Sequence, residues 1–219
     1  MIIAIDGPAG SGKSTVARLI AKKLGFVYID TGAMYRALTL KAMQDSVDLK
    51  DEAALVRLAQ HTSLKLEQGP DDKIKVLLDG KDVSSQIRAL DVTNNISYVA
   101  DVPGVRRQMV KLQRLIGHSA KKGAVLEGRD IGTVVFPDAY KKFYLDASTE
   151  ERARRRYKEL IENGIKTDLK SIEEDIKIRD AKDKTRKVGT LKKAADAILI
   201  DTTSLTIDEV VNEILSKVC

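Results

Sequence analysis

The stretch Gly7-Pro8-Ala9-Gly10-Ser11-Gly12-Lys13-Ser14 decides the fold of this chain. It matches the pattern G-x-x-x-x-G-K-[ST] and lies between a short apolar run at residues 1–5 and residues 15–24, whose apolar side chains recur at helical spacing. Glycines allow the backbone to curve around a phosphate with its N–H groups pointing inward. The stretch therefore predicts a phosphate loop between a strand and a helix.

This loop predicts a bound nucleoside triphosphate with a magnesium ion. Lys13 would contact the β- and γ-phosphates as a point charge, and the Ser14 hydroxyl would be a ligand of Mg²⁺. The helix that begins near Lys13 adds the positive end of its dipole. The residues expected to bind ATP are Gly7, Pro8, Ala9, Gly10, Ser11, Gly12, Lys13, Ser14 and Thr15.

The composition limits the class of protein and the kind of metal site. The 219 residues suffice for one α/β domain with insertions, and no apolar run approaches the roughly 18 residues of a membrane helix. We therefore expect a cytoplasmic location. The chain has a single cysteine, Cys219, which excludes an internal disulfide. Because it also has only two histidines, His61 and His118, the metal ion that is easiest to defend is Mg²⁺ bound by oxygen ligands.

The charge balance points to anionic partners. The net charge is +6, from 38 Lys and Arg against 32 Asp and Glu. Aromatic residues make up only 4% of the chain, and no run of basic and aromatic residues indicates a platform for stacking bases. We therefore expect small anions as ligands, no nucleic acid, no membrane partner and, without an apolar heptad seam, a monomer.

Apolar runs predict a parallel sheet that is interrupted by a small antiparallel one. The runs that predict core strands lie at 1–6, 25–30, 124–127, 142–146 and 197–201. Helical patterns are found at 31–44, 51–60, 91–100, 103–118, 171–183 and 206–218, and Thr31 fits an N-cap. Short strands are predicted at 63–68, 73–78 and 81–83, with a tight turn at Asp79-Gly80. This insertion is either a substrate-binding lobe or a surface decoration.

Two further segments carry charged residues where ligands bind in α/β folds. Gly128-Arg129-Asp130 follows a predicted core strand, at the carboxyl edge of the sheet, and Arg36 could face the same edge. The arginine-rich run at 150–158 suits a mobile lid, a solvated helix face or a nucleic-acid patch. Beyond it, Arg179, Asp183 and Arg186 share one helix face, where surface salt bridging is the simplest account.

Four blocks of sequence resemble the signature blocks of the bacterial cytidylate kinase family, in the family's order. They read IDGPAGSGKST (5–15), DTGAMYR (30–36), EGRDIGTVVFPDA (127–139) and DASTEERA (146–153), and the similarity extends over about residues 1–218. The absence of an N-K-x-D stretch and of a second nucleotide domain agrees with a small kinase. The resemblance implies phosphoryl transfer from ATP, as co-substrate, to CMP or dCMP.

The resemblance also implies a fold and a domain plan. The fold would be a P-loop three-layer α/β fold, with a five-stranded parallel sheet flanked by helices, a small antiparallel insertion and a helical lid. The core would comprise 1–35, 88–148 and 184–219, the CMP-binding insertion 36–87, and the lid with its adjoining helix 149–183.

Site residues follow from matching the family's motifs. Those expected to bind CMP are Thr31, Arg36, Ser97, Arg106, Arg129, Asp130, Arg179, Asp183 and Arg186. Those expected to assist transfer are Lys13, Arg36 and Arg129, together with Arg152 and Arg156, which lie four residues apart on one helix face and are the lid candidates. Glu127, where family members often have aspartate, would hold Mg²⁺ through water beside Ser14.

The chemistry of cytosine suits two of these residues. Asp130 can accept a hydrogen bond from the N4 amino group, while Arg106 donates to the ring acceptors. Uracil presents like groups to the same pair. Alternatives remain: a kinase for UMP, AMP or a metabolite alcohol, or a basic nucleic-acid-binding module that uses ATP as a switch.

Overall fold

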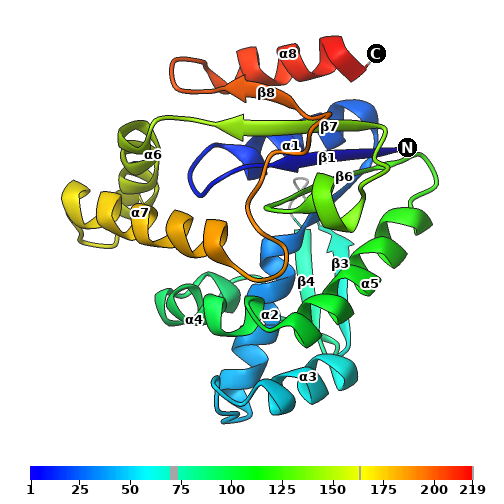
Figure 1. Ribbon diagram of the computed structural model, residues 1–219, viewed down its shortest axis with the longest axis vertical. Coiled ribbons are helices and arrows are strands. Elements are labelled where there is room, and N and C mark those ends of the chain that lie inside the picture. Colours follow the sequence, from blue (N-terminus) through cyan, green and yellow to red (C-terminus); the bar gives the residue numbers. More distant parts are fainter. Residues whose placement is uncertain (70–73, 163, 219) are drawn as a thin grey trace.

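The computed structural model describes residues 1–69, 74–162 and 164–218, and its centre is a five-stranded parallel sheet (Figure 1). In spatial order the strands are β2 (Val27–Asp30), β6 (Ala124–Gly128), β1 (Ile2–Asp6), β7 (Lys141–Asp146) and β8 (Ile198–Asp201). Each strand lies where the apolar runs predicted one. The expected fold class is confirmed.

Helices cover both faces of the sheet because side chains alternate along each strand. Ile3 and Ile5 of β1 pack in one core with α1 (Lys13–Leu24) and α8 (Ile207–Val218). Ala4 belongs to the other core, together with α2 (Thr31–Gln44) and α5 (Pro103–Ser119). β1 is therefore buried on both sides, and the phosphate loop extends from its end.

The insertion contains the expected small antiparallel sheet. After α3 (Glu52–His61) come β3 (Leu64–Gln68), β4 (Ile74–Leu78) and β5 (Lys81–Asp82), which pair in that order, followed by a 3₁₀ turn, η2 (Gln86–Arg88), and α4 (Leu90–Ala100). Asp79 and Gly80 have φ of 48° and 82°, as a tight hairpin turn requires. Leu64, Val76 and Leu78 join the core formed by α2 and α5. Residues 70–73 of the expected turn and strand, and the Cys219 thiol, lie outside the described residues.

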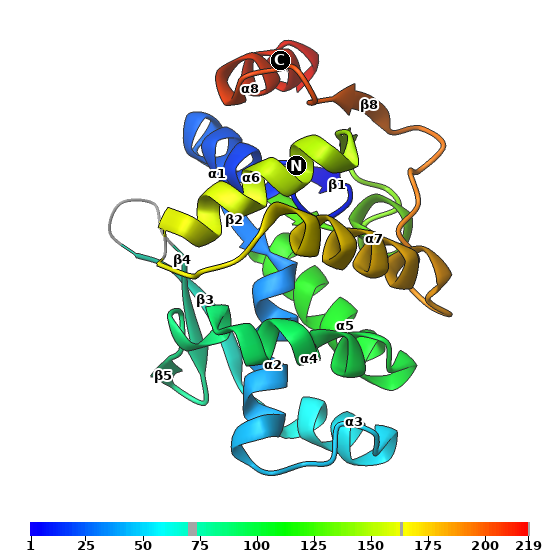
Figure 2. The ribbon, with the colours of Figure 1, turned by 90° about the vertical axis from the view of Figure 1, so that its left-hand side faces the viewer.

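Two helices follow β7, and the first contains the arginine-rich run. α6 (Thr149–Glu162) and α7 (Leu169–Thr185) lie alongside each other (Figure 2), joined by a small apolar cluster of Ala153, Ile172 and Ile176. α7 begins two residues before the predicted position. None of the helices in the described ranges is long and apolar enough to cross a membrane.

Two local features differ from the sequence predictions. The N-cap of α2 is Asp30, whose Oδ1 accepts from the Ala33 N–H at 2.7 Å, and not Thr31. The Thr31 hydroxyl donates instead to the Glu127 carbonyl at 2.7 Å. A five-residue π-helix, η3 (Ile131–Val135), follows Asp130, where no helix was predicted.

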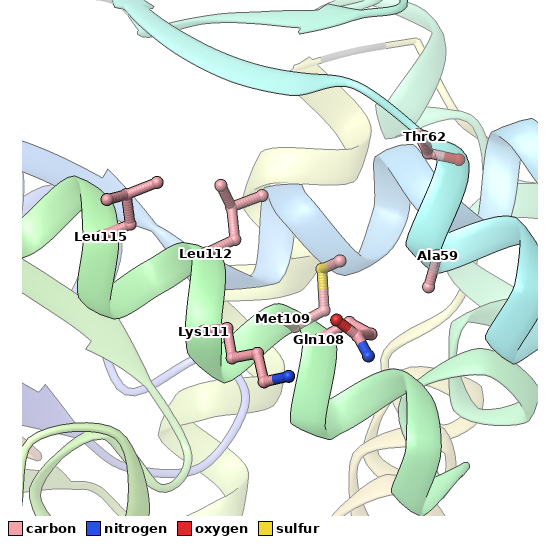
Figure 3. Close-up of a pocket in the computed structure, with 7 residues that line it drawn as sticks. All are labelled: Ala59, Thr62, Gln108, Met109, Lys111, Leu112 and Leu115. Atoms are coloured by element: carbon pink, nitrogen blue, oxygen red, sulfur yellow. The ribbon is translucent and has the colours of Figure 1, made fainter.

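A pocket of about 270 Å³ lies between α3 and α5 (Figure 3). It is lined by Ala59, Thr62, Gln108, Met109, Lys111, Leu112 and Leu115. None of these residues belongs to the predicted site.

Candidate active site

The phosphate loop has the backbone that its glycines predict. Gly7, Gly10 and Gly12 have φ of 151°, 79° and 85°, values that other residues rarely adopt. A Cβ on Gly7 would also overlap the carbonyl oxygen of Leu145. The loop can therefore curve from β1 into α1 only with glycine at these positions.

Lys13 lies inside the loop and is 4% exposed. Its Nζ donates to the Pro8 carbonyl at 2.5 Å and to the Ser11 hydroxyl at 3.3 Å. Burial, and then the positive charge of Arg129, lower its pKa from 10.5 to about 7. A phosphate anion placed here would restore the charged form.

The metal ligands expected from the sequence meet at the mouth of the loop. The Ser14 hydroxyl donates to Glu127 Oε1 at 2.5 Å, and the Tyr28 hydroxyl donates to the same oxygen at 3.2 Å. Burial and the nearby Asp30 raise the pKa of Glu127. No cluster of three His, Cys, Asp or Glu side chains that could hold a metal exists among the described residues. A hydroxyl beside a carboxylate fits Mg²⁺ that also takes oxygen ligands from phosphate and water.

Arg106 and Asp130 form a buried pair. Arg106 Nη2 donates to Asp130 Oδ2 at 2.5 Å, and Nη1 donates to the Ala100 carbonyl at 3.0 Å. The guanidinium lies over the Tyr35 ring, 5.3 Å from its centroid. Ser97, on α4, is half-buried, and in the described part of the chain no hydrogen bond joins its side chain to this pair.

A second network joins the loop after β6 to the end of α7. Asp183 accepts from Arg129 Nε at 2.9 Å and from Arg186 Nη2 at 2.5 Å. Arg186 Nε also donates to Asp101 at 2.5 Å. Burial would raise the pKa of Asp183, but the charges of Arg129, Arg186 and Arg179 outweigh it and lower the pKa. Asp183 of α7 thus joins Arg129 and Arg186 in a buried network, where a surface salt bridge was the simplest expectation.

Arg179 makes no ion pair within 4.0 Å with the other described residues. Burial and the charges of Arg129, Arg36 and Arg156 lower its pKa to about 10, although Asp183 opposes them. Arg36 is held by Asp30, with its Nη2 3.0 Å from Oδ2. We call Lys13, Arg36, Arg129, Arg156 and Arg179 the cation cluster. The mutual influence of these cations on their pKa values shows that they lie near one another, an arrangement that suits an anion site.

Arg152 and Arg156, both expected to act in a lid, have different surroundings. Arg152 is 4% exposed, donates to the Ala9 carbonyl of the phosphate loop at 3.0 Å and pairs with Asp180 at 2.6 Å. Arg156 pairs with Glu159 at 2.7 Å on the helix surface. In this conformation Arg152 ties α6 and α7 to the loop, and Arg156 is the more accessible of the two.

Other residues that contact the site escaped the sequence analysis. Arg155 donates to the Thr202 hydroxyl at 3.0 Å, and Thr202 donates to the Ser11 carbonyl at 3.4 Å. Asp6 accepts from backbone N–H groups of η3. Only the place of Asp6, next to the loop at a strand end, gave any signal for its involvement.

Comparisons with known proteins agree on one family. The family model described as cytidylate kinase matches residues 3–219. The cytidylate kinase of Desulforamulus reducens is 53% identical over 216 residues, covering 99% of this chain and 96% of the relative. That of Lactobacillus johnsonii is 51% identical over 214 residues, covering 98% and 92%.

Solved structures show the fold alone, since their identity is low. An uncharacterized protein from Eubacterium ventriosum superposes with a TM-score of 0.53 at 14% identity, covering 100% of this chain and 98% of that one. The protein TT1252 from Thermus thermophilus gives a TM-score of 0.50 at 17% identity, with the same coverage.

Proposed function

This chain belongs to the cytidylate kinase family, and from that premise we propose that it transfers the γ-phosphoryl group of ATP to CMP or dCMP, with Mg²⁺, giving ADP and CDP or dCDP. The observation that carries the proposal is the proximity of Lys13 to Arg129. Arg129 is near enough to lower the pKa of Lys13, and it precedes Asp130 of the buried pair. The donor loop and the acceptor residues thus share one cation cluster.

The Arg106–Asp130 pair supports the choice of base. Asp130 has a second carboxylate oxygen beside the one bound by Arg106, and it would accept from cytosine N4 while Arg106 donates to the ring. Uracil would place a carbonyl against the carboxylate. An unpaired buried polar group costs about 1–3 kcal/mol, so the pair favours cytosine. Ser97 and Thr31 would complete the proposed CMP site.

The remaining acceptor residues suit the sugar and the phosphate. Arg36 and Arg129 would hold the CMP phosphate, while Arg179, Asp183 and Arg186 would contact the ribose. Asp183 is already oriented by two arginines, so little side-chain freedom is lost when the ligand binds. These residues would select a nucleoside monophosphate over a neutral alcohol.

Transfer requires no general base. The acceptor oxygen belongs to a phosphate whose second pKa is about 6, so it is already ionised at neutral pH. Catalysis then depends on position and charge: Lys13 on the donor phosphates, Arg36 and Arg129 on the acceptor, and Arg156 on the moving phosphoryl group. Ser14, and Glu127 through water, would hold Mg²⁺, which would supply positive charge to the triphosphate.

The domain plan is part of the proposal. Residues 1–35, 88–148 and 184–219 would form the core, 36–87 the CMP-binding insertion, and 149–183 the lid with its adjoining helix. Closure would exclude water, which competes as an acceptor. We further propose that the protein acts as a monomer in the cytoplasm, without nucleic-acid or membrane partners.

An acceptor panel tests the proposed function. ADP production from ATP and Mg²⁺ is measured with CMP, dCMP, UMP and AMP at matched concentrations. We expect the highest kcat/KM for CMP or dCMP. A preference for UMP or AMP would refute the cytosine assignment, and ADP production that no nucleotide stimulates would refute the kinase itself.

A further inference from the structure

Asp6 is a buried acid at the end of β1, directly before the phosphate loop. It is 4% exposed. Its Oδ1 accepts from the Ile131 N–H at 2.8 Å and its Oδ2 accepts from the Gly132 N–H at 2.7 Å. These are the first two residues of η3, so both carboxylate oxygens bind the start of the π-helix.

The backbone of Asp6 fixes the other side of the same loop. In the β1–β6 ladder Asp6 is the register partner of Gly128. Gly128 precedes Arg129 and Asp130, while Ile131 and Gly132 follow them. One residue therefore brackets the two acceptor residues, through its backbone before them and its side chain after them.

Arg114 of α5 holds the far end of η3. Its Nε donates to the Val135 carbonyl at 2.7 Å, and its Nη2 donates to the Val134 carbonyl at 2.9 Å. Short π-helices are rare in proteins, and those that occur often lie at functional sites. This one is held at both ends by charged side chains from different elements.

Burial disfavours a charged carboxylate at position 6. Burial, together with the nearby charge of Asp130, raises its pKa from 3.8 to about 6, although the two backbone hydrogen bonds and Lys13 act in the opposite direction. A neutral side chain of this size would avoid the penalty of burying a charge. Only a carboxylate of this length presents two acceptors to two adjacent N–H groups, which indicates that orientation of the loop is what Asp6 provides.

We infer that Asp6 is a positioning residue for the acceptor side of the site, which orients Arg129 and Asp130 through η3 although it lies in the strand of the ATP loop. This inference rests on the proposed function for the identity of the acceptor. Asp6 itself touches neither substrate in it. Its loss should therefore weaken CMP recognition and leave ATP recognition nearly intact.

The kinetic test compares Asp6→Asn, Arg114→Ala and the control Lys111→Ala. Asparagine keeps the volume but offers only one acceptor, so we expect the KM for CMP to rise roughly tenfold and the KM for ATP to change less than about twofold. Arg114 is exposed, so its replacement spares the core and should raise the KM for CMP about threefold. Lys111, an exposed cation one turn earlier on α5, should have no effect.

Hydrogen exchange of the Ile131 and Gly132 amides tests, without any substrate, whether the Asp6 carboxylate orders the start of η3. Exchange should be faster in Asp6→Asn than in the wild type. An unchanged exchange rate would show that Asp6 does not order the start of η3. Equal increases in the KM for CMP and the KM for ATP, or no increase in either variant, would overturn the positioning role. If the wild type does not phosphorylate CMP, the proposed function fails, while the exchange rates still decide whether Asp6 orders η3.

Discussion

The phosphate loop offers backbone N–H groups and one lysine, whereas the proposed acceptor side consists of charged side chains that already pair with one another. The loop occupies eight consecutive residues, and its shape depends on three glycines with positive φ. The acceptor side gathers arginines and aspartates from α2, α5, the loop after β6 and α7. The donor half is thus set by local backbone geometry, and the acceptor half by tertiary packing.

The largest effect is expected from Lys13→Met, which removes the one charged side chain inside the loop. Loss of a single preorganised donor costs about 10²–10³ in kcat, and a buried cation on the transferring phosphates belongs at or above the upper end of that range. Steady-state assays should show this loss with the KM for CMP changed less than about threefold. A normal kcat with a raised KM for CMP would show that Lys13 does not act on the donor phosphates.

Arg152→Ala and Arg156→Ala should separate structure from catalysis in α6. Removal of Arg152 leaves Asp180 buried without its partner and should lower the free energy of unfolding by about 3–5 kcal/mol. Removal of the partly exposed Arg156 should lower it by less than about 1 kcal/mol and reduce kcat instead. Urea unfolding and turnover measure the two effects. Equal stability losses would contradict the distinction between the two arginines.

Asp6 should make stability depend on pH. Its folded-state pKa of about 6 lies above the value of 3.8 for the unfolded chain, so between these values the folded state binds more protons. The free energy of unfolding therefore decreases as pH rises from 4 to 7, by up to about 3 kcal/mol from this group. Asp6→Asn should remove that slope in urea unfolding. Parallel wild-type and variant profiles would show that the pKa of Asp6 is ordinary.

Gly189→Ala should give the smallest effect. Gly189 has φ of 70°, and a Cβ there would overlap the Arg106 guanidinium. Gly164→Ala is a matched control, because Gly164 has φ of 75° but no atom within 4 Å of the added Cβ. Both should lose about 1 kcal/mol of stability, and only Gly189→Ala should raise the KM for CMP, by about threefold to tenfold. The same KM for CMP in both variants would show that the space beside Gly189 does not matter for the position of Arg106.

The sequence predicted the core fold well because its signals are local. Apolar runs located all five strands of the sheet, and the Asp79-Gly80 pair located the hairpin turn. Spacing and family motifs identified Arg106, Asp130 and Asp183, which the structure places in two buried networks. Their proposed roles toward CMP remain predictions.

The rest depended on contacts that no local pattern encodes. The two ends of the π-helix are bound by Asp6 and Arg114, which lie far apart in the sequence. Arg152 was expected to act in a lid like Arg156, but it is buried, where it contacts Asp180 and the Ala9 carbonyl. The cap of α2 was misplaced by one residue because Asp30 and Thr31 are both good N-caps and only the fold decides between them.

The central claim is that the donor and acceptor are recognised by separate halves of one site, with Asp130 reading the base. The most direct test is the ratio of kcat/KM for CMP to that for UMP, measured in the wild type and in Asp130→Ala, with the KM for ATP in both. We predict that the substitution reduces this ratio at least about tenfold and changes the KM for ATP less than about twofold. An unchanged ratio, or equal rises in the KM for CMP and ATP, would contradict the account.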